Sequence, residues 1–196
     1  MLLSSAYFPP TEYFAVLARY SVRIDDTENY VKQTYRNRCR IATAGGVQTL
    51  TIPVVKSDTH KQLMKDVRIS DHGDWRRQHW NALESAYMNS PFFMYYQDDF
   101  RPFYEKKYEF LMDFNMELTE VILNLAGIKK VVARTDAYMR DAASIKDLRN
   151  LIDPGQEQSG ANRPYWQVFA TKYGFTGGLS AVDLLFNMGP EFPLYL

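Results

Sequence analysis

The sequence predicts an α/β or α+β fold, in which a β-α-β unit opens the chain and a small mixed sheet is followed by a helical half with one long helix. Three observations predict this fold. Two short apolar runs flank an amphipathic run within the first 25 residues. A Gly-Gly pair near residue 45 separates two strand-like runs, and apolar residues recur at a three-four spacing between residues 102 and 126.

Prolines and the spacing of apolar residues predict the limits of the elements in the opening unit. Residues 2–6 are apolar enough for a strand, which Pro9 and Pro10 end because proline removes a ladder donor. Residues 11–20 show helical spacing, and residues 21–25 alternate like a second strand. Strands joined by such a crossover are parallel and leave a crevice at their carboxyl ends.

A hairpin follows this unit. Residues 39–43 and 47–55 are predicted as its strands, because Gly-Gly between alternating runs is typical of a tight turn. Pro53 near the end of the second run favours an edge position. A further short strand is expected around residues 67–69.

The remainder is expected to be mainly helical. Residues 75–88 form a predicted helix with Asp74 as its N-cap, and the long helix is predicted over 102–126. Residues 153–164, which contain two Gly and two Pro, are expected to form a flexible loop. Ser180 and the acidic residue three positions later then resemble a capping box for a last helix. We treat 1–196 as a single domain.

Composition narrows the class of protein. The chain has 196 residues, 23 basic and 23 acidic side chains, one cysteine and 46% hydrophobic residues. These values are those of a globular chain, and zero net charge argues against nucleic acid as a partner. A single cysteine fits a reducing compartment. No run is long enough for a membrane span, and the start lacks a signal peptide, so we expect a cytoplasmic protein without an integral membrane segment.

The densest polar cluster is DDTENYVKQTYRNRCR, residues 25–40. In a strand, Arg36, Arg38 and Arg40 would project from one face and repel one another unless they met an anion. That anion is either a ligand or the carboxylates at the start of the same segment. Arginine's planar fork suits phosphate and carboxylate groups, so anion binding and internal pairing both stay open.

A second cluster is WRRQHW, residues 75–80. His79 is a candidate general base because its charge changes near neutral pH, and the alternative is a hydrogen-bonded, half-buried histidine. The three histidines show no zinc-type spacing, and Cys39 has no partner motif. The sequence therefore predicts neither a metal site nor a cofactor.

The aromatic content points towards a ligand surface or a core. The chain has 14 Tyr, 12 Phe and 3 Trp. Tyrosine often keeps its hydroxyl near a polar partner at a cleft or interface, which favours a polar, partly planar ligand such as a sugar or nucleotide. A tyrosine-rich core is the alternative.

Several segments together resemble the WbqC-like protein family of bacteria. They are AYFPPTEYF, IDDTENYVKQTYRNRC, the LTIPV strand, ISDHGDWRRQHWNALESAYMNSPFF and the ending LSAVDLLFNMGPEFPLYL. The opening departs from the glutamine-proline start of many members, since Ser5 and Ala6 precede Tyr7 here. The family is associated with gene clusters for surface polysaccharide (O-antigen) synthesis. The resemblance therefore implies a cytoplasmic bacterial protein that acts on an activated sugar.

Two hypotheses follow. In the first, the protein is an enzyme, such as a group transferase on a nucleotide sugar, whose ligand lies in the crevice at the strand ends. Asp26 and His79 are then the acid/base candidates, and the ligand contacts are Tyr7, Tyr13, Tyr35, Arg36, Asn37 and Arg38. In the second, it is a non-catalytic binding or assembly protein with an aromatic-rich interface. An oligomer is compatible with both.

Overall fold

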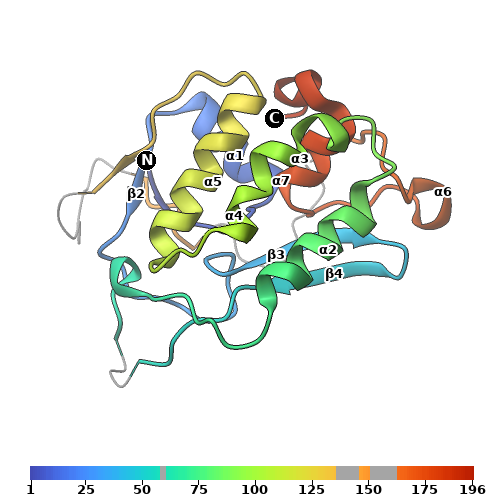
Figure 1. Cartoon of the computed structure of the whole chain (residues 1–196). Coiled ribbons are helices and arrows are strands. Elements are labelled where there is room, and N and C mark those ends of the chain that lie inside the picture. Colours follow the sequence, from blue (N-terminus) through green and yellow to red (C-terminus); the bar gives the residue numbers. More distant parts are fainter. Residues whose placement is uncertain (58–60, 136–145, 151–162) are drawn as a thin grey trace.

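A parallel three-stranded sheet forms one side of the protein. The computed structural model describes residues 1–57, 61–135, 146–150 and 163–196. In it, β1 (Leu2–Ser4), α1 (Thr11–Arg19) and β2 (Arg23–Asp25) form the predicted β-α-β unit, with β1 and β2 adjacent and parallel (Figure 1). The strand β5 (Ala133–Arg134) pairs in parallel with β2 and gives the order β1-β2-β5. The mixed helix and strand content confirms the α/β class.

The predicted hairpin is a second, separate sheet. Its strands β3 (Arg38–Thr43) and β4 (Gly46–Thr51) are antiparallel, with Thr43 opposite Gly46. The turn needs glycine because residue 46 has a φ of +107°, which side chains disfavour. Parallel and antiparallel pairs therefore lie in two sheets rather than in one mixed sheet. The strand β4 ends at Thr51, before the predicted limit at residue 55, and Val54 pairs with Ile69 in an isolated antiparallel bridge.

The helical half contains one long helix, but that helix starts later than the sequence predicts. After α2 (Trp75–Tyr87), which lies against β3, come α3 (Phe93–Phe100) and α4 (Pro102–Glu105). The long helix α5 (Leu111–Leu125) follows a break. The break arises because residues 109–111 pair with residues 67–69: the Ile69 amide donates to Glu109 O at 2.9 Å and the Leu111 amide to Val67 O at 2.9 Å.

The carboxyl-terminal segment regains helical structure. It contains α6 (Ala170–Tyr173), α7 (Ala181–Met188) and the 3-10 helix η2 (Gly189–Tyr195); a shorter one, η1 (Met64–Asp66), precedes α2. Ser180 caps α7 by accepting a hydrogen bond from the Val182 amide. The capping box itself does not close, because the buried Asp183 carboxylate accepts from Tyr165 and Gln167 instead. The expected loop at 153–164 lies almost wholly outside the described residues.

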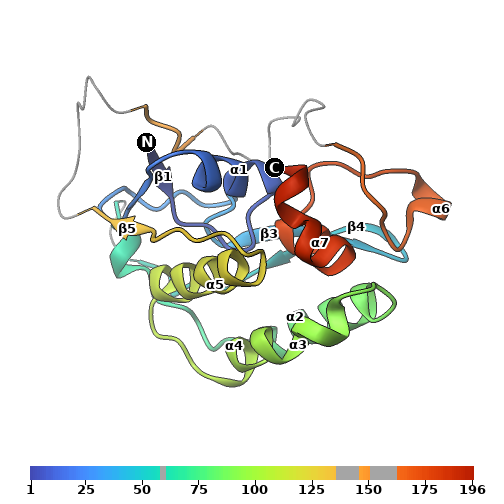
Figure 2. The same cartoon turned by 90° about the horizontal axis from the view of Figure 1, so that it is seen from above.

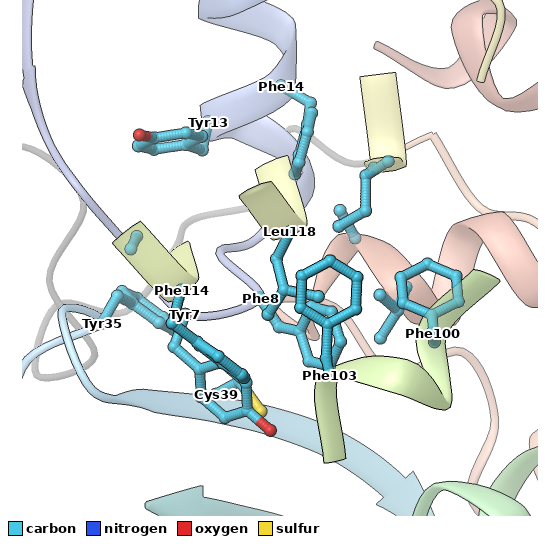
Figure 3. Packing of buried hydrophobic residues seen from close by; sticks show 14 of the residues in the cluster. Tyr7, Phe8, Tyr13, Phe14, Tyr35, Cys39, Phe100, Phe103, Phe114 and Leu118 are labelled. Carbon is cyan, nitrogen blue, oxygen red and sulfur yellow. The ribbon is translucent and has the colours of Figure 1, made fainter. Parts of the chain in front are cut away.

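The core accounts for much of the tyrosine excess. Among the described residues, Tyr7, Tyr13, Tyr35, Tyr87 and Tyr104 are buried. Figure 3 shows Tyr7 beside Cys39 of β3, and Phe8 in the cluster that also contains Phe100 and Phe103. One hydrophobic cluster thus includes residues from the opening unit, the hairpin and the helices. Figure 2 shows α5 and α7 between α1 on one side and α2, α3 and α4 on the other.

No helix within the described ranges is long and apolar enough to cross a bilayer.

A candidate site at the carboxyl edge of the parallel sheet

Polar side chains gather where the parallel strands end. The strand β1 ends at Ser4 and is followed by Ser5. The strand β2 ends at Asp25 and is followed by Asp26, and Thr135 follows β5. The carboxyl ends of parallel strands meet at one edge, which is where open α/β sheets bind ligands. We name this set of residues, together with Glu28, Arg36 and Arg149, the carboxyl-edge cluster.

Arg36 and Glu28 form a buried ion pair in this cluster. The Arg36 Nε donates to Glu28 Oε1 at 2.9 Å and Nη2 donates to Oε2 at 2.6 Å, while the two residues are 4% and 5% exposed. Nη1 and Nη2 also donate to the hydroxyls of Thr34 and Ser4. The guanidinium therefore uses four of its five N–H bonds inside the protein, and Glu28 offsets its charge. This geometry favours a positioning role for Arg36.

Arg36 does not share a strand face with the two later arginines, so that expectation was wrong. It lies in a turn before β3, which begins at Arg38. Arg38 and Arg40 do alternate along one face of β3, opposite Thr51 and Thr49 of β4. Both are partly exposed, and neither forms an ion pair within the described part of the chain. The Nε of Arg38 is buried without a hydrogen-bond partner there.

A second buried ion pair links the sheet to residues 146–150. Asp25 is fully buried and accepts from Arg149 Nη1 at 2.6 Å and from the backbone and hydroxyl of Thr27. Arg149 also binds Asp147 through Nε and Nη2. The two carboxylates, Asp147 first, raise the pKa of the Arg149 guanidinium, and Arg149 lowers the pKa of Asp147. Arg149 thus holds two acidic segments together.

Asp26 is the less enclosed carboxylate of this edge. It is partly exposed and forms no ion pair with the described residues, whereas Asp25 and Glu28 each have an arginine. The Thr135 hydroxyl lies 3.3 Å from an oxygen of both Asp25 and Asp26. Asp26 is therefore the carboxylate of the cluster that remains available to a ligand.

A narrow cleft opens beside this cluster. Its enclosed part measures about 20 Å³, enough for one water molecule, so a larger ligand would contact the mouth of the cleft. Tyr13 is fixed there because its hydroxyl donates to Ser4 O at 2.9 Å. The Tyr35 hydroxyl is buried without a hydrogen bond in the described chain, although Arg40 lies near enough to offset part of the rise in pKa that burial causes. The lining residues are Leu3, Ser4, Ser5, Ala6, Tyr13, Tyr35, Arg36, Leu148 and Arg149.

Tyr7 and His79 form a different group, inside the core. The Tyr7 hydroxyl lies 2.9 Å from His79 Nδ1 and 2.9 Å from the Tyr104 hydroxyl. His79 packs edge-on against Trp75 and is 5% exposed. Burial lowers its pKa to about 4, although a hydrogen bond with the Thr51 backbone opposes this, so the ring is neutral at pH 7. Neither Tyr7 nor His79 lines the cleft.

Asn37 and Cys39 support the fold around the cleft. Asn37 is buried, and its Nδ2 donates to Ile52 O at 2.9 Å, which ties the turn to the end of the hairpin. Cys39 is fully buried, and burial raises the pKa of its thiol, which disfavours the thiolate. No group of three or more His, Cys, Asp or Glu residues in the described ranges is arranged to hold a metal ion.

Of the residues predicted from sequence, the structure brings Tyr13, Tyr35 and Arg36 to the cleft and places Asp26 at the same edge of the sheet. It leaves Tyr7, Asn37 and His79 elsewhere. Sequence reasoning missed Asp25, Glu28 and Arg149 as site residues. Asp25 carried a usable signal, since it ends a predicted parallel strand. Arg149 carried none, because no local pattern marks its neighbourhood.

Comparisons with known proteins identify the family of this chain. The model of the WbqC-like protein family matches residues 4–157, most of the chain. The protein therefore belongs to the WbqC-like family. It is also 30% identical to the uncharacterized protein Rv1507c of Mycobacterium tuberculosis, over all of this chain and 96% of that protein. The family match ends before the last helix, and no solved structure matched significantly.

Proposed function

We propose that the protein is an enzyme that acts on an activated sugar or a related anionic metabolite, bound at the mouth of the carboxyl-edge cleft. One observation carries this proposal: Ser5, Tyr35 and Arg36 line a cleft beside the carboxyl end of β1, at the sheet edge where Asp26 follows β2. Hydroxyl, carboxylate and guanidinium groups at such an edge are suited to a polar metabolite. The association of the family with O-antigen gene clusters supports a sugar as the substrate class and bacterial surface polysaccharide synthesis as the setting.

The charges around the cluster indicate where the sugar hydroxyls and the anionic part of the ligand would bind. Asp25, Glu28 and Asp147 are paired with two arginines, so the edge carries surplus negative charge and suits sugar hydroxyls rather than phosphate. The anionic part would instead contact Arg38 and Arg40, which lack carboxylate partners in the described chain. Tyr35 connects the two, because it lines the cleft and lies beside Arg40.

Asp26 is the acid/base candidate for this reaction. Its carboxylate is partly exposed and unpaired among the described residues, so it could accept a proton from a sugar hydroxyl and activate that oxygen for group transfer. His79 supports this chemistry less well, because it lies in the core with Tyr7. Arg36 would act through Glu28 by fixing the turn before β3.

The test is a thermal-shift screen of the full chain against a panel of nucleotide sugars. We expect at least one to raise the melting temperature. Tyr35→Phe and Arg38→Gln should each remove most of that shift and leave the melting temperature of the free protein nearly unchanged, because neither breaks an ion pair within the described residues.

Arg23→Gln is the matched control. Arg23 starts β2, so it is an exposed arginine at the opposite edge of the same sheet. Its variant should bind as the unmodified protein does. The proposal is wrong if no anionic sugar stabilises the protein, or if Arg23→Gln weakens binding as much as Arg38→Gln does.

The alternative, a binding or assembly protein with an aromatic interface, has less support. Five tyrosines of the described ranges are buried in the core, and the adjacent Met94 and Tyr95 on α3 are 56% and 76% exposed. It predicts a stable oligomer in light scattering and no stabilisation by small molecules.

A further inference from the structure

A cavity of about 260 Å³ lies between the start of α2 and α4, away from the carboxyl-edge cleft. It shares none of its lining residues with that cleft. Its floor is aromatic: Trp75, Trp80 and Tyr104 are each less than a tenth exposed. The remaining lining residues are Gly73, Asp74, Arg76, Arg77, Arg101 and Glu105.

The walls carry three arginines, each of which forms an ion pair with a carboxylate. Arg77 and Arg101 pair with Asp74 and Glu105 across exposed ion pairs. Exposed pairs of this kind exchange partners at little cost, because solvent and salt screen their charges. An anion that enters the cavity can therefore recruit both arginines.

Arg76 brings a largely buried guanidinium to the cavity. Its side chain is only 13% exposed, stacks over the Trp75 ring at 4.8 Å and donates from Nη1 to Asp71 at 2.7 Å. Its Nε and Nη2 are buried and form no hydrogen bond within the described ranges. Buried donors without acceptors are costly, and a guanidinium presents them in a fork that matches phosphate oxygens.

The aromatic floor is held in place from behind. The Tyr104 hydroxyl bonds to Tyr7, which bonds to His79, and Trp80 packs against Phe93 and Tyr104. The amino-terminal end of α2 adds positive potential at the cavity through the helix dipole. Its backbone amides are not capped by Asp74, whose side chain pairs with Arg77 instead. A rigid apolar floor below walls with three arginines, two of them in exposed ion pairs, suits a ligand with a flat ring and an anionic head.

We propose that this cavity is a second ligand site, which binds a small organic phosphate with a flat ring, of the nucleoside monophosphate type. The phosphate would lie among Arg76, Arg77 and Arg101, and the ring over Trp80 and Tyr104. Tryptophan fluorescence reports on the site directly, because two of the three tryptophans line it.

The experiment titrates the full-length Trp166→Phe variant with AMP and records fluorescence. Trp166 is 52% exposed and does not line the cavity, so this change removes the background signal. We expect saturable fluorescence change at sub-millimolar AMP. Adding Arg77→Gln or Arg101→Gln should raise the half-saturation concentration about fivefold each. Inorganic phosphate and adenosine should each bind more weakly than AMP.

Arg68→Gln is the matched control, because Arg68 is an exposed arginine paired with Glu109 outside the cavity. It should leave the half-saturation concentration within about twofold. The proposal fails if AMP at millimolar concentrations leaves the fluorescence unchanged, or if Arg68→Gln weakens binding as much as Arg77→Gln. Tyr35→Phe should not alter AMP binding, which separates this site from the carboxyl-edge cleft.

Discussion

The Arg36–Glu28 pair offers the sharpest test of how the candidate site is built. In Arg36→Met the Glu28 carboxylate would lose both guanidinium bonds, at 2.9 and 2.6 Å, and remain buried with the Ser4 hydroxyl as its one side-chain partner among the described residues. Leaving one half of a buried ion pair unpaired costs about 3–5 kcal/mol. We therefore expect the free energy of unfolding to fall by that amount.

The double variant Arg36→Met/Glu28→Leu distinguishes the cost of an unpaired charge from the loss of side-chain packing. With both charges removed, no uncompensated carboxylate remains, so the double variant should be more stable than Arg36→Met alone. Urea denaturation gives the free energies, and for a chain of this size the single variant should melt roughly 6–20 °C lower.

Arg68→Met supplies the surface comparison. Arg68 and Glu109 are 3.2 Å apart with side chains 60% exposed, so breaking this pair should cost less than about 1 kcal/mol. Our account of the cluster is refuted if Arg36→Met costs no more than Arg68→Met. It is also refuted if the double variant loses more free energy of unfolding than Arg36→Met and Glu28→Leu lose together.

Three further results are expected. The folded pKa of His79 is about 4, below its unfolded value near 6.5, so its contribution to stability is present above pH 6.5 and is lost as the pH falls towards 4. His79→Gln should remove about 2 kcal/mol from the stability difference between pH 7 and pH 5 measured in urea; an unchanged difference would contradict this. Gly189 has a φ of +52°, and a Cβ there would lie 2.5 Å from the Phe92 ring, so Gly189→Ala should cost about 2–4 kcal/mol in calorimetry, and a loss below about 0.5 kcal/mol would refute that packing. Cys39, fully buried, should react with a thiol reagent only at the rate of unfolding, and rapid native labelling would show that it is accessible.

Local signals predicted the elements that local sequence determines. The β-α-β unit and the hairpin follow from prolines, glycines and alternation within a few residues, and both were confirmed. The start of the long helix was wrong, because residues 109–111 pair with Val67–Ile69 some 40 residues earlier. The three-four spacing does not reveal such a distant strand-like partner.

For the site, too, local patterns were predicted from the sequence and distant contacts were not. Asp26 and Arg36 were predicted from the sequence because they lie in an obvious polar run, and the structure places both in the carboxyl-edge cluster. The strand face with three arginines failed, since Arg36 turns inward to meet Glu28, eight residues before it, while only Arg38 and Arg40 keep the alternation. Burial decides this outcome, because a buried guanidinium needs a carboxylate more than it needs a regular strand. Arg149 reaches Asp25 from 124 residues away, which a single sequence does not indicate.

The most direct test of the central claim is a map of amide chemical shifts during titration with a nucleotide sugar that stabilises the protein. The largest changes are expected at residues 4–6, 35 and 36, which line the cleft, at Asp26 on the same edge of the sheet, and at Arg38 and Arg40, which would contact the anionic part of the ligand. Changes confined to residues 73–80 and 101–105, or the absence of any change at the carboxyl edge of the parallel sheet, would contradict it.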